Sequence, residues 1–406
     1  MRFLTCRFIV VLWCFVAVLT PAFAAEPNRD EQLIRIEKAI ATGAAFLAKE
    51  QNADGTWRSR TYGLLKDGTS LTPLVLLSLA ESAEANVARE RGCKAIARWV
   101  QVDGQSVRIT TAAQYPIYTA GLCLQFQCND GSKPTQDAII AWSSLLLQHQ
   151  LNQQNGWSVE DSRFGGWSYS HEAPKKPEPG VPLSPLDEPN LSATVFALEG
   201  LLAADPEGRT NIAARRMALR FVQRCQNFHE TSSPNDARFN DGGFHFMLGD
   251  EVRNKPGVAE IDTMGETRFI SYGSATADGL RALLLCGMNS DHPRVLAATK
   301  WLSEHFDDGS HPGTYPAERR HLQASLDFYY AASLARTLHL ASVDDDRTLG
   351  HGRWVKVLAE QLIRRQRADG SWSNPAVDVR EDDPLIATPL ALRALTICRD
   401  ELQQSR

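Results

Sequence analysis

The segment Leu71-Thr-Pro-Leu-Val-Leu-Leu-Ser-Leu79 is apolar on nearly every face of a helix. Such a helix has no polar stripe to turn toward water, so the pattern predicts burial on all sides. Five other segments share its register, in which a Thr or Tyr is followed by an apolar residue four positions later. The six marker residues are Thr72, Thr119, Thr194, Thr276, Tyr330 and Thr388. This repetition predicts six inner helices of one repeating fold.

Amphipathic segments alternate with these apolar ones. In residues 31–50, apolar residues recur every three or four positions from Leu33 to Leu47, and charged residues occupy the other side. Similar patterns predict outer helices at about 85–102, 134–151, 209–226, 291–306 and 353–366. Six apolar helices are buried only if they form a ring with the amphipathic helices around it. The sequence therefore predicts an all-α (α/α)6 toroid, with residues 25–406 as a single domain.

Recurrent turns join each outer segment to the following inner one. Gln51-Asn-Ala-Asp-Gly55-Thr-Trp57 and Gln366-Arg-Ala-Asp-Gly370-Ser-Trp372 share a Gln-x3-Gly-x-Trp spacing. Glycine can take the positive φ that ends a helix, and the Trp can fold back over it, so both tryptophans are expected to be structural. Weaker copies are Gly156-Trp157 after Gln150, His305-x3-Gly309, and the doubled glycines of 163–169 and 238–246. Long insertions at about 158–188 and 228–272 are expected to shape a mouth.

With these repeats the sequence resembles the superfamily of squalene and hopene cyclases and protein prenyltransferase β subunits, over about residues 31–402. The resemblance implies a toroid that handles isoprenoids. Hopene-type cyclases carry an Asp-x-Asp-Asp motif just before an inner-helix marker, where the acid protonates a double bond. None of the matching stretches of this sequence contains that acid triplet. The resemblance therefore predicts the fold more firmly than the chemistry.

Protein prenyltransferases of this superfamily bind zinc through an Asp-x-Cys pair and the His of an Asp-Phe-Tyr-His motif. Asp327-Phe-Tyr-Tyr330 matches the second motif, but Tyr330 occupies the His position. Ile270 and Tyr272 stand where the Asp and Cys are expected. Zinc requires three or four nitrogen, sulfur or oxygen ligands, so we expect neither a metal nor another cofactor.

Three residues are candidates for acid or base chemistry. Asp327 precedes Tyr330 on an otherwise apolar helix, where a buried carboxylate needs partners or a raised pKa. Asp278 lies inside the fourth inner helix, and His245 lies between two phenylalanines. Aromatic side chains that suit an isoprenoid chain or a carbocation are expected to line the cavity. These candidate substrate-binding residues are Tyr169, Tyr272, Tyr329 and Tyr330.

Three functions remain open on the sequence. The first is an isoprenoid-binding relative of the cyclases and prenyltransferases with altered catalytic residues, whose turnover is undecided. The second is a non-catalytic scaffold for a protein partner, and the third is a glycan-active lyase or hydrolase. A hydrophobic small molecule is the expected ligand, and peripheral membrane contact stays open. A formal net charge of -5 argues against nucleic acid as a partner.

The N-terminus has the pattern of a secretory signal peptide. A basic start is followed by an apolar run from Phe8 to Leu19 and by Ala22-Phe-Ala24, so cleavage is expected after Ala24. The product would be periplasmic or secreted, although retention as an anchor stays open. Six cysteines would remain in the mature chain and are expected to be buried thiols, with Cys123 and Cys128 as a weak bridge candidate.

Overall fold

The computed structural model describes residues 28–79, 85–103, 106–129, 135–229, 239–261, 267–342 and 353–404. The expected signal peptide lies outside these residues. The predicted outer helices are α1 (Arg29–Lys49), α3 (Asn86–Ala97), α5 (Gln136–Gln148), α7 (Ile212–Arg224), α9 (Pro293–His305) and α12 (Arg353–Arg365). The predicted inner helices are α2 (Leu71–Ser78), α4 (Pro116–Asn129), α6 (Leu191–Ala204), α8 (Gly273–Leu285), α11 (Asp327–Ser342) and α13 (Pro384–Gln404).

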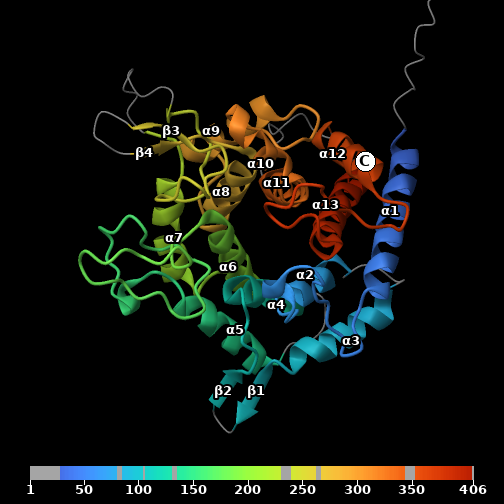
Figure 1. Cartoon of the computed structure of the whole chain (residues 1–406), viewed down its shortest axis with the longest axis horizontal. Coiled ribbons are helices and arrows are strands. Elements are labelled where there is room, and N and C mark those ends of the chain that lie inside the picture. Colours follow the sequence, from blue (N-terminus) through green and yellow to red (C-terminus); the bar gives the residue numbers. More distant parts are fainter. Residues whose placement is uncertain are drawn as a thin grey trace, which may run out of the picture.

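The inner helices form a closed ring. Each contacts the next in the order α2, α4, α6, α8, α11, α13, and α13 returns to α2. The outer helices surround this ring, as Figure 1 shows. All six marker residues are fully buried on the inner helices. The predicted (α/α)6 toroid is therefore confirmed.

Shorter elements lie between the paired helices. They are η1 (Gly63–Leu65), η3 (Gln153–Asn155), η5 (Ala317–Arg319), α10 (Arg320–Ala324) and strands β1 (Val100–Asp103), β2 (Ser106–Ile109), β3 (Val258–Ile261) and β4 (Thr267–Phe269). The strands form two antiparallel hairpins, β1–β2 and β3–β4. The helix predicted over 85–102 is wrong at its end, because the alternating Val100 and Val102 belong to β1.

Glycine-aromatic turns fasten four of the outer helices, α1, α5, α7 and α12, to their inner partners. The Trp57 backbone N–H donates to the marker hydroxyl of Thr72 at 3.1 Å, and its indole N–H donates to the carbonyl of Leu47 at the end of α1. Trp372 repeats both bonds, with Thr388 and Leu362. Gly55 sits in the turn with a φ of 89°. Because the same bonds occur in both turns, the marker residue and the tryptophan recur together in the sequence, and both tryptophans have the expected structural role.

In the third repeat, the structure corrects the alignment of Gly156-Trp157 with the glycine-tryptophan turn. Gln150 donates to the carbonyl of Gly165, not to Gly156, and Trp167 makes the two anchoring bonds, to Thr194 and Leu146. Trp157 instead bonds Pro174 within the insertion. The extra residues of this repeat therefore lie partly inside the turn, between Gln150 and Gly165, and partly after it, between Trp167 and the start of α6. The fourth repeat is built likewise, since Gln226 donates to the carbonyl of Gly242.

Two helices of the ring approach especially closely. A Cβ added to Gly121 of α4 would lie 2.4 Å from the carbonyl oxygen of Phe196 on α6, and one added to Gly200 would lie 2.7 Å from the Gly121 Cα. Only glycine permits this approach.

The six cysteines of the described chain are free thiols, Cys123 and Cys128 included. The expected burial holds for Cys123, Cys225 and Cys398, whereas Cys93, Cys128 and Cys286 are only partly buried. Within the same residues, no helix combines the length and the hydropathy that a membrane span requires.

Candidate functional site

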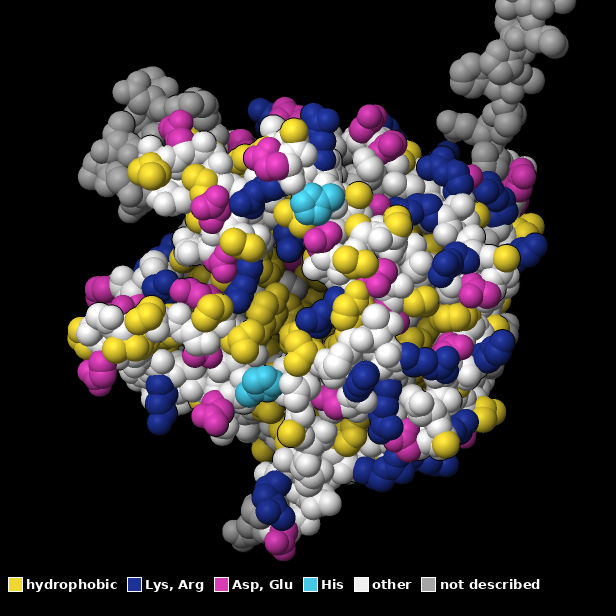
Figure 2. All heavy atoms as spheres, in the orientation of Figure 1, with side chains coloured by type: hydrophobic (Ala, Val, Ile, Leu, Met, Phe, Trp, Pro, Cys, Tyr) yellow, Lys and Arg dark blue, Asp and Glu magenta, His cyan; other side chains and the backbone are white. Residues whose placement is uncertain are grey.

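One face of the toroid carries the mouth of the ring. Every outer helix leads into the N-terminal end of an inner helix, so the long connections gather at the face where the inner helices begin. The connections at 149–190 and 225–272 contain the two insertions, as expected. Figure 2 shows a hollow in the middle of the molecule, with many hydrophobic side chains in its wall and basic side chains near it. This hollow is the candidate site.

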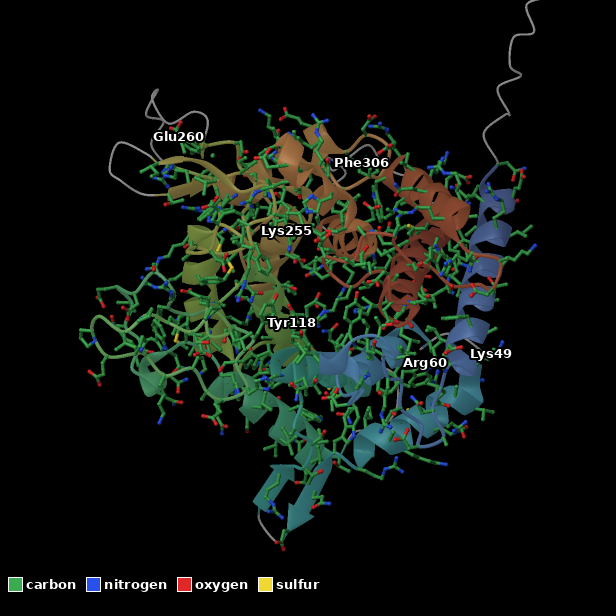
Figure 3. The ribbon with its side chains drawn as sticks, in the orientation of Figure 1. Lys49, Arg60, Tyr118, Lys255, Glu260 and Phe306 are labelled. Carbon is green, nitrogen blue, oxygen red and sulfur yellow. The ribbon has the colours of Figure 1, made fainter. Side chains whose placement is uncertain are left out.

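Five tyrosines gather at this end of the ring, and we call them the tyrosine hollow: Tyr62, Tyr115, Tyr118, Tyr169 and Tyr329. All five are partly exposed. The Tyr118 ring is stacked with that of Tyr169 at 5.9 Å, and the Tyr115 ring meets both edge-on at 6.1–6.2 Å. Figure 3 shows Tyr118 beside the central opening. Aromatic contacts thus hold the rings in place from α4 and from the loop before α6.

Protein partners occupy four of the hydroxyl groups in the tyrosine hollow. Tyr118 donates to Ser192 at 2.8 Å, Tyr329 to Asp278 at 2.6 Å and Tyr62 to Asp382 at 2.5 Å. The Tyr115 hydroxyl accepts a bond of 2.6 Å from Arg380. A ligand in the hollow would therefore meet chiefly aromatic ring surface, which suits hydrocarbon and other apolar groups.

Arg380 stands at the mouth in an unusual backbone conformation. Its φ of 67° is the one positive value among non-glycine residues of the described chain. The guanidinium lies 5.4 Å from the Tyr62 ring centre and 5.7 Å from that of Tyr115. Left-handed arginine is strained by about 1–2 kcal/mol, and the two cation-π contacts help to hold it. The arginine thus joins the loop before α13 to the loops before α2 and α4.

Asp278 lies directly below the tyrosine hollow. Its carboxylate accepts bonds from Tyr329 and Ser333, both at 2.6 Å, and from Arg281 at 2.8 Å. Burial raises the pKa of Asp278, and the Arg281 charge opposes that rise. Burial also raises the pKa of Tyr329 well above its usual range. A protonated tyrosine is thus held against a buried carboxylate, an arrangement that can deliver or accept a proton.

A hydrogen-bonded chain connects that pair with the hollow. Tyr118 donates to Ser192, whose hydroxyl oxygen lies 2.6 Å from the Tyr329 hydroxyl, and Tyr329 donates to Asp278. The chain runs through α4, α6, α11 and α8. Each hydroxyl can both accept and donate a hydrogen bond. A proton can therefore move between Asp278 and the tyrosine hollow without a rearrangement of the backbone.

Deeper in the ring lies a second set of side chains, the polar layer: Gln125, Glu199, Arg281, Arg336 and Arg393. Glu199 lies 3.1 Å from Arg281 and 2.5 Å from Arg336. The amide oxygen of Gln125 accepts bonds from Arg336 at 2.9 Å and from Arg393 at 3.3 Å. Because Arg336 on α11 reaches Gln125 on α4, these bonds cross the axis of the ring. The lower ring is consequently closed by side chains.

The polar layer was not expected from inner segments that are apolar on nearly every face. It holds three arginines, and among the described residues the carboxylates of Glu199 and Asp278 pair with them. The Gln125 amide nitrogen and one Glu199 oxygen are buried without a hydrogen-bond partner among the described residues. Sequence reasoning missed the layer, although a signal existed. A polar residue follows the marker by five or six positions in all six inner segments, and in five of them it belongs to the polar layer.

The structure places Asp327 away from the lumen. Its carboxylate pairs with Arg365 of the outer helix α12 at 2.9 Å, and the same guanidinium covers the Phe328 ring at 4.5 Å. Burial raises the Asp327 pKa against the opposing charge of Arg365. Asp327 thus joins α11 to the outer ring. It therefore lies outside the hollow, whereas the candidate Asp278 lies next to it.

His245 is buried next to Phe269, with ring centres 5.4 Å apart. Burial, reinforced by the charge of Arg268, lowers its pKa to about 3. The imidazole is therefore neutral near pH 7. The backbone N–H of His245 donates to the carbonyl of Cys225, which follows the end of α7. The structure gives His245 a packing role rather than a place at the hollow.

Tyr272 and Tyr330 pack together around a buried histidine. The His311 ring lies 5.8 Å from that of Tyr272 and 5.2 Å from that of Tyr330. His311 accepts a bond from the backbone N–H of Ser274 at the start of α8, and burial lowers its pKa to about 4. Tyr272 and Tyr330 are 2% and 0% exposed. Of the four candidate substrate-binding tyrosines, only Tyr169 and Tyr329 therefore present surface in the hollow.

Glu381 is a buried acid that sequence reasoning overlooked. It accepts bonds from the backbone N–H groups of Phe328 and Tyr329, at 3.0 and 2.6 Å, and from the Asn374 side chain. Burial raises its pKa to about 7, although these donors oppose the rise. Glu381 fixes the start of α11 and so the direction of Tyr329. No sequence pattern marks it, because its partners lie 52 and 53 residues away.

No group of His, Cys, Asp and Glu in the described residues has the arrangement of a metal site. The zinc positions implied by the family resemblance hold Tyr272 and Tyr330, which pack on His311, and Ile270. A single buried histidine without an acidic or thiolate neighbour does not provide the ligand set for zinc. The absence of zinc from the purified protein stays a prediction that metal analysis tests.

Known proteins of similar structure share this fold. A type II terpene cyclase from Scytonema, in complex with geranylgeranyl dihydroxybenzoate, matches with a TM-score of 0.55 at 14% identity, over 91% of this chain and 99% of that one. A D-mannose isomerase matches with a TM-score of 0.56 at 13% identity, over 94% and 100% of the two chains. A cellobiose 2-epimerase from Spirochaeta thermophila matches with 0.51 at 11% identity, over 91% and 97%.

These similarities extend over nearly the whole toroid, and at such low identity they show the fold alone. No protein-family model matches the sequence, and no curated protein matches it. The terpenoid cyclase-like toroid expected from the repeats is thus found in the structure. The same α/α architecture also serves two sugar-converting enzymes, so the chemistry has to be inferred from the side chains of this chain.

Proposed function

We propose that the protein is an exported toroid that binds an isoprenoid or similar amphipathic lipid in the tyrosine hollow. One observation carries the proposal: four tyrosine hydroxyls are bound by protein partners, so the hollow offers ring surface. Such a surface favours hydrocarbon over groups that need hydrogen bonds. The Scytonema cyclase, which has the same fold, holds a geranylgeranyl compound, and this supports the ligand class.

In this proposal Tyr329 and Asp278 handle protons at the bottom of the hollow. Tyr329 touches the ligand, and Asp278 accepts the hydrogen bond that Tyr329 donates. Aromatic faces above them would stabilise positive charge that develops on a protonated double bond. In this scheme a protonated Asp278 would pass its proton to Tyr329 as Tyr329 protonates a double bond of the ligand. The resulting carbocation would then lose a proton to Tyr118, and the chain through Ser192 and Tyr329 would return a proton to Asp278. This pathway requires no metal and replaces the missing Asp-x-Asp-Asp acid by a residue inside α8.

The test begins with the purified mature protein. Solvent extraction followed by mass spectrometry identifies a bound lipid, and titration with geranylgeraniol or geranylgeranyl dihydroxybenzoate, monitored by tryptophan fluorescence, measures affinity. We expect saturable binding that Tyr118→Ala and Tyr169→Ala weaken. Product formed from the bound compound would identify an enzyme, and binding without product would identify a carrier. Absence of binding to every isoprenoid tested would leave a protein-binding scaffold as the better proposal.

A sugar-active enzyme is the second candidate. It is favoured by the two carboxylates of Asp278 and Glu199 on either side of Arg281, because paired acids with an arginine are typical of glycan chemistry. These groups are largely occupied with one another, which makes them less available than the tyrosine rings. The same fluorescence titration with mannose, cellobiose and uronic acids separates the candidates, since only a sugar site would saturate with them.

Export is part of the proposal and has its own test. The basic start, apolar run and Ala-Phe-Ala ending support cleavage after Ala24. N-terminal sequencing of the exported protein is expected to begin at Ala25. A retained N-terminus on membrane-bound protein would instead favour the anchored form.

A further inference from the structure

Lys255 is a cation beside the tyrosine hollow with no anionic partner in contact. It belongs to the connection between α7 and α8, and Figure 3 shows it beside the central opening, as it shows Tyr118. Lys255 is partly buried. Among the described residues, no hydrogen bond or ion pair joins its ammonium group to a carboxylate. The nearby Asp250 is instead paired with Arg253 at 3.3 Å.

The backbone around Lys255 is fixed by hydrogen bonds. The preceding Asn254 is fully buried, and its side chain accepts from the backbone of Phe246 and donates to the carbonyls of Met247 and Asp250. Arg319 donates to the Asn254 carbonyl. Lys255 is thus held in place rather than left on a free loop. Such a scaffold is what a binding residue needs, because little ordering remains to be done when the ligand arrives.

The same connection is joined to the wall of the ring. A backbone hydrogen bond from Lys255 reaches the hydroxyl of the buried Tyr272, on which the charge of Asp278 also acts. Burial lowers the pKa of Lys255, and Asp378 opposes that change from a distance. A partly buried ammonium without a contacting anion is costly, and a bound oxyanion would remove the cost.

We propose that the ammonium group of Lys255 binds a carboxylate or phosphate oxygen of the ligand in the tyrosine hollow. The inference rests on the proposed function for the hydrocarbon part and adds the chemistry of the polar end. The ligand would lay its apolar part on the tyrosine rings and its acidic end at Lys255.

Three compounds with one hydrocarbon chain test the proposal: geranylgeraniol, geranylgeranoic acid and geranylgeranyl phosphate. We expect the wild-type protein to bind one or both acids about tenfold more tightly than the alcohol. Lys255→Met should remove this preference and leave the alcohol affinity unchanged, whereas Lys255→Arg should keep it. Lys300→Met, on the exposed face of α9, is the matched control. Equal affinity for alcohol and acids, or a preference that survives Lys255→Met, would overturn the proposal.

A second measurement does not depend on the hydrocarbon. Lysine acetylation by a soluble acylating reagent is followed by mass spectrometry, in phosphate and in chloride of equal ionic strength. Protection of Lys255 by phosphate, without protection of Lys300, would support an oxyanion site. If no isoprenoid binds in the titrations, the same result would reject only the proposed lipid and not the oxyanion site. Equal labelling of Lys255 in phosphate and in chloride, together with equal affinities for geranylgeraniol and the two acids, would reject the oxyanion site. The proposal that the hollow binds a lipid would be unaffected by that result.

Discussion

The tyrosine hollow and the polar layer are built on the same inner helices and differ in how their polar groups are satisfied. On α4, Tyr118 is the third residue and Gln125 the tenth, so the two levels lie about 10 Å apart along the axis. In the hollow, tyrosine hydroxyls find partners in the wall, and the rings stay partly exposed. In the layer, side chains meet across the axis and cover one another.

This difference separates a level that can exchange a ligand from one that maintains the ring. A ligand can lie on the tyrosine faces without breaking any protein hydrogen bond. Entry into the polar layer would require the separation of buried ion pairs, which costs several kcal/mol per uncompensated charge. The closed lower ring therefore gives the hollow its floor. Substitutions in the polar layer should consequently reduce stability more than ligand binding, and substitutions in the tyrosine hollow should reduce ligand binding more than stability.

Arg281→Met is expected to have the largest effect on stability. It leaves the carboxylates of Asp278 and Glu199 without their shared partner, and Arg281 is only 3% exposed. Breaking a buried pair in this way costs about 3–5 kcal/mol. Urea unfolding measures the loss. Arg58→Met, which removes an exposed pair with Asp54, serves as control and should cost no more than about 1 kcal/mol; similar losses would contradict the distinction.

Glu381→Gln tests the anchor of α11, the helix that carries both Tyr329 and Arg336. The folded-state pKa of Glu381 is raised to about 7 from its usual 4.5, so the folded protein keeps this proton to higher pH than the unfolded chain. Its contribution to stability is therefore lost as pH rises from about 4.5 to 7. Relative to wild type, the variant should gain about 3 kcal/mol across that window.

Urea unfolding of both proteins at pH 5 and pH 8 measures the change. The amide resembles the protonated carboxyl group, so the two proteins should be closest in stability at the lower pH. A gap that stays constant with pH, or that moves in favour of wild type at pH 8, would show that Glu381 is ionised in the folded protein throughout.

Two substitutions of Tyr118 distinguish the contribution of its ring to ligand binding from the contribution of its hydroxyl group. Tyr118→Ala should weaken isoprenoid binding about tenfold, because it removes stacking surface worth about 1–1.5 kcal/mol. Tyr118→Phe should keep that affinity, since the hydroxyl is bound to Ser192 and not to the ligand. Fluorescence titration of both variants decides the matter. Loss of binding in Tyr118→Phe would show that the ligand hydrogen-bonds the hydroxyl and would favour a polar ligand.

Asp327→Asn should have the smallest effect. Its partly exposed pair with Arg365 joins α11 to α12, so the variant is expected to lose about 1 kcal/mol of stability and none of the ligand affinity. Asp278→Asn is the comparison, because it should reduce any turnover strongly. A loss of turnover in Asp327→Asn with Asp278→Asn active would return Asp327 to the site.

The sequence by itself determined the helical repeat. Apolar segments without a polar stripe must be buried, and a Thr at a fixed register position can accept the bond that each glycine-aromatic turn donates. Local spacing was sufficient because these contacts recur between neighbouring helices. Even the interruption of the repeat at Gly165 remained consistent with the fold, since an insertion inside a surface turn leaves both helices in place.

Only the tertiary structure decided the site. The sequence favours Asp327 over Asp278 as the functional acid, but α11 turns Asp327 toward Arg365, while α8 turns Asp278 toward Tyr329. Glu381 and Tyr329 are 52 residues apart and meet only because α13 and α11 are neighbours in the ring. The direction of a side chain around a helix axis, and the partner it meets across a closed ring, follow from packing of the whole chain and not from local pattern.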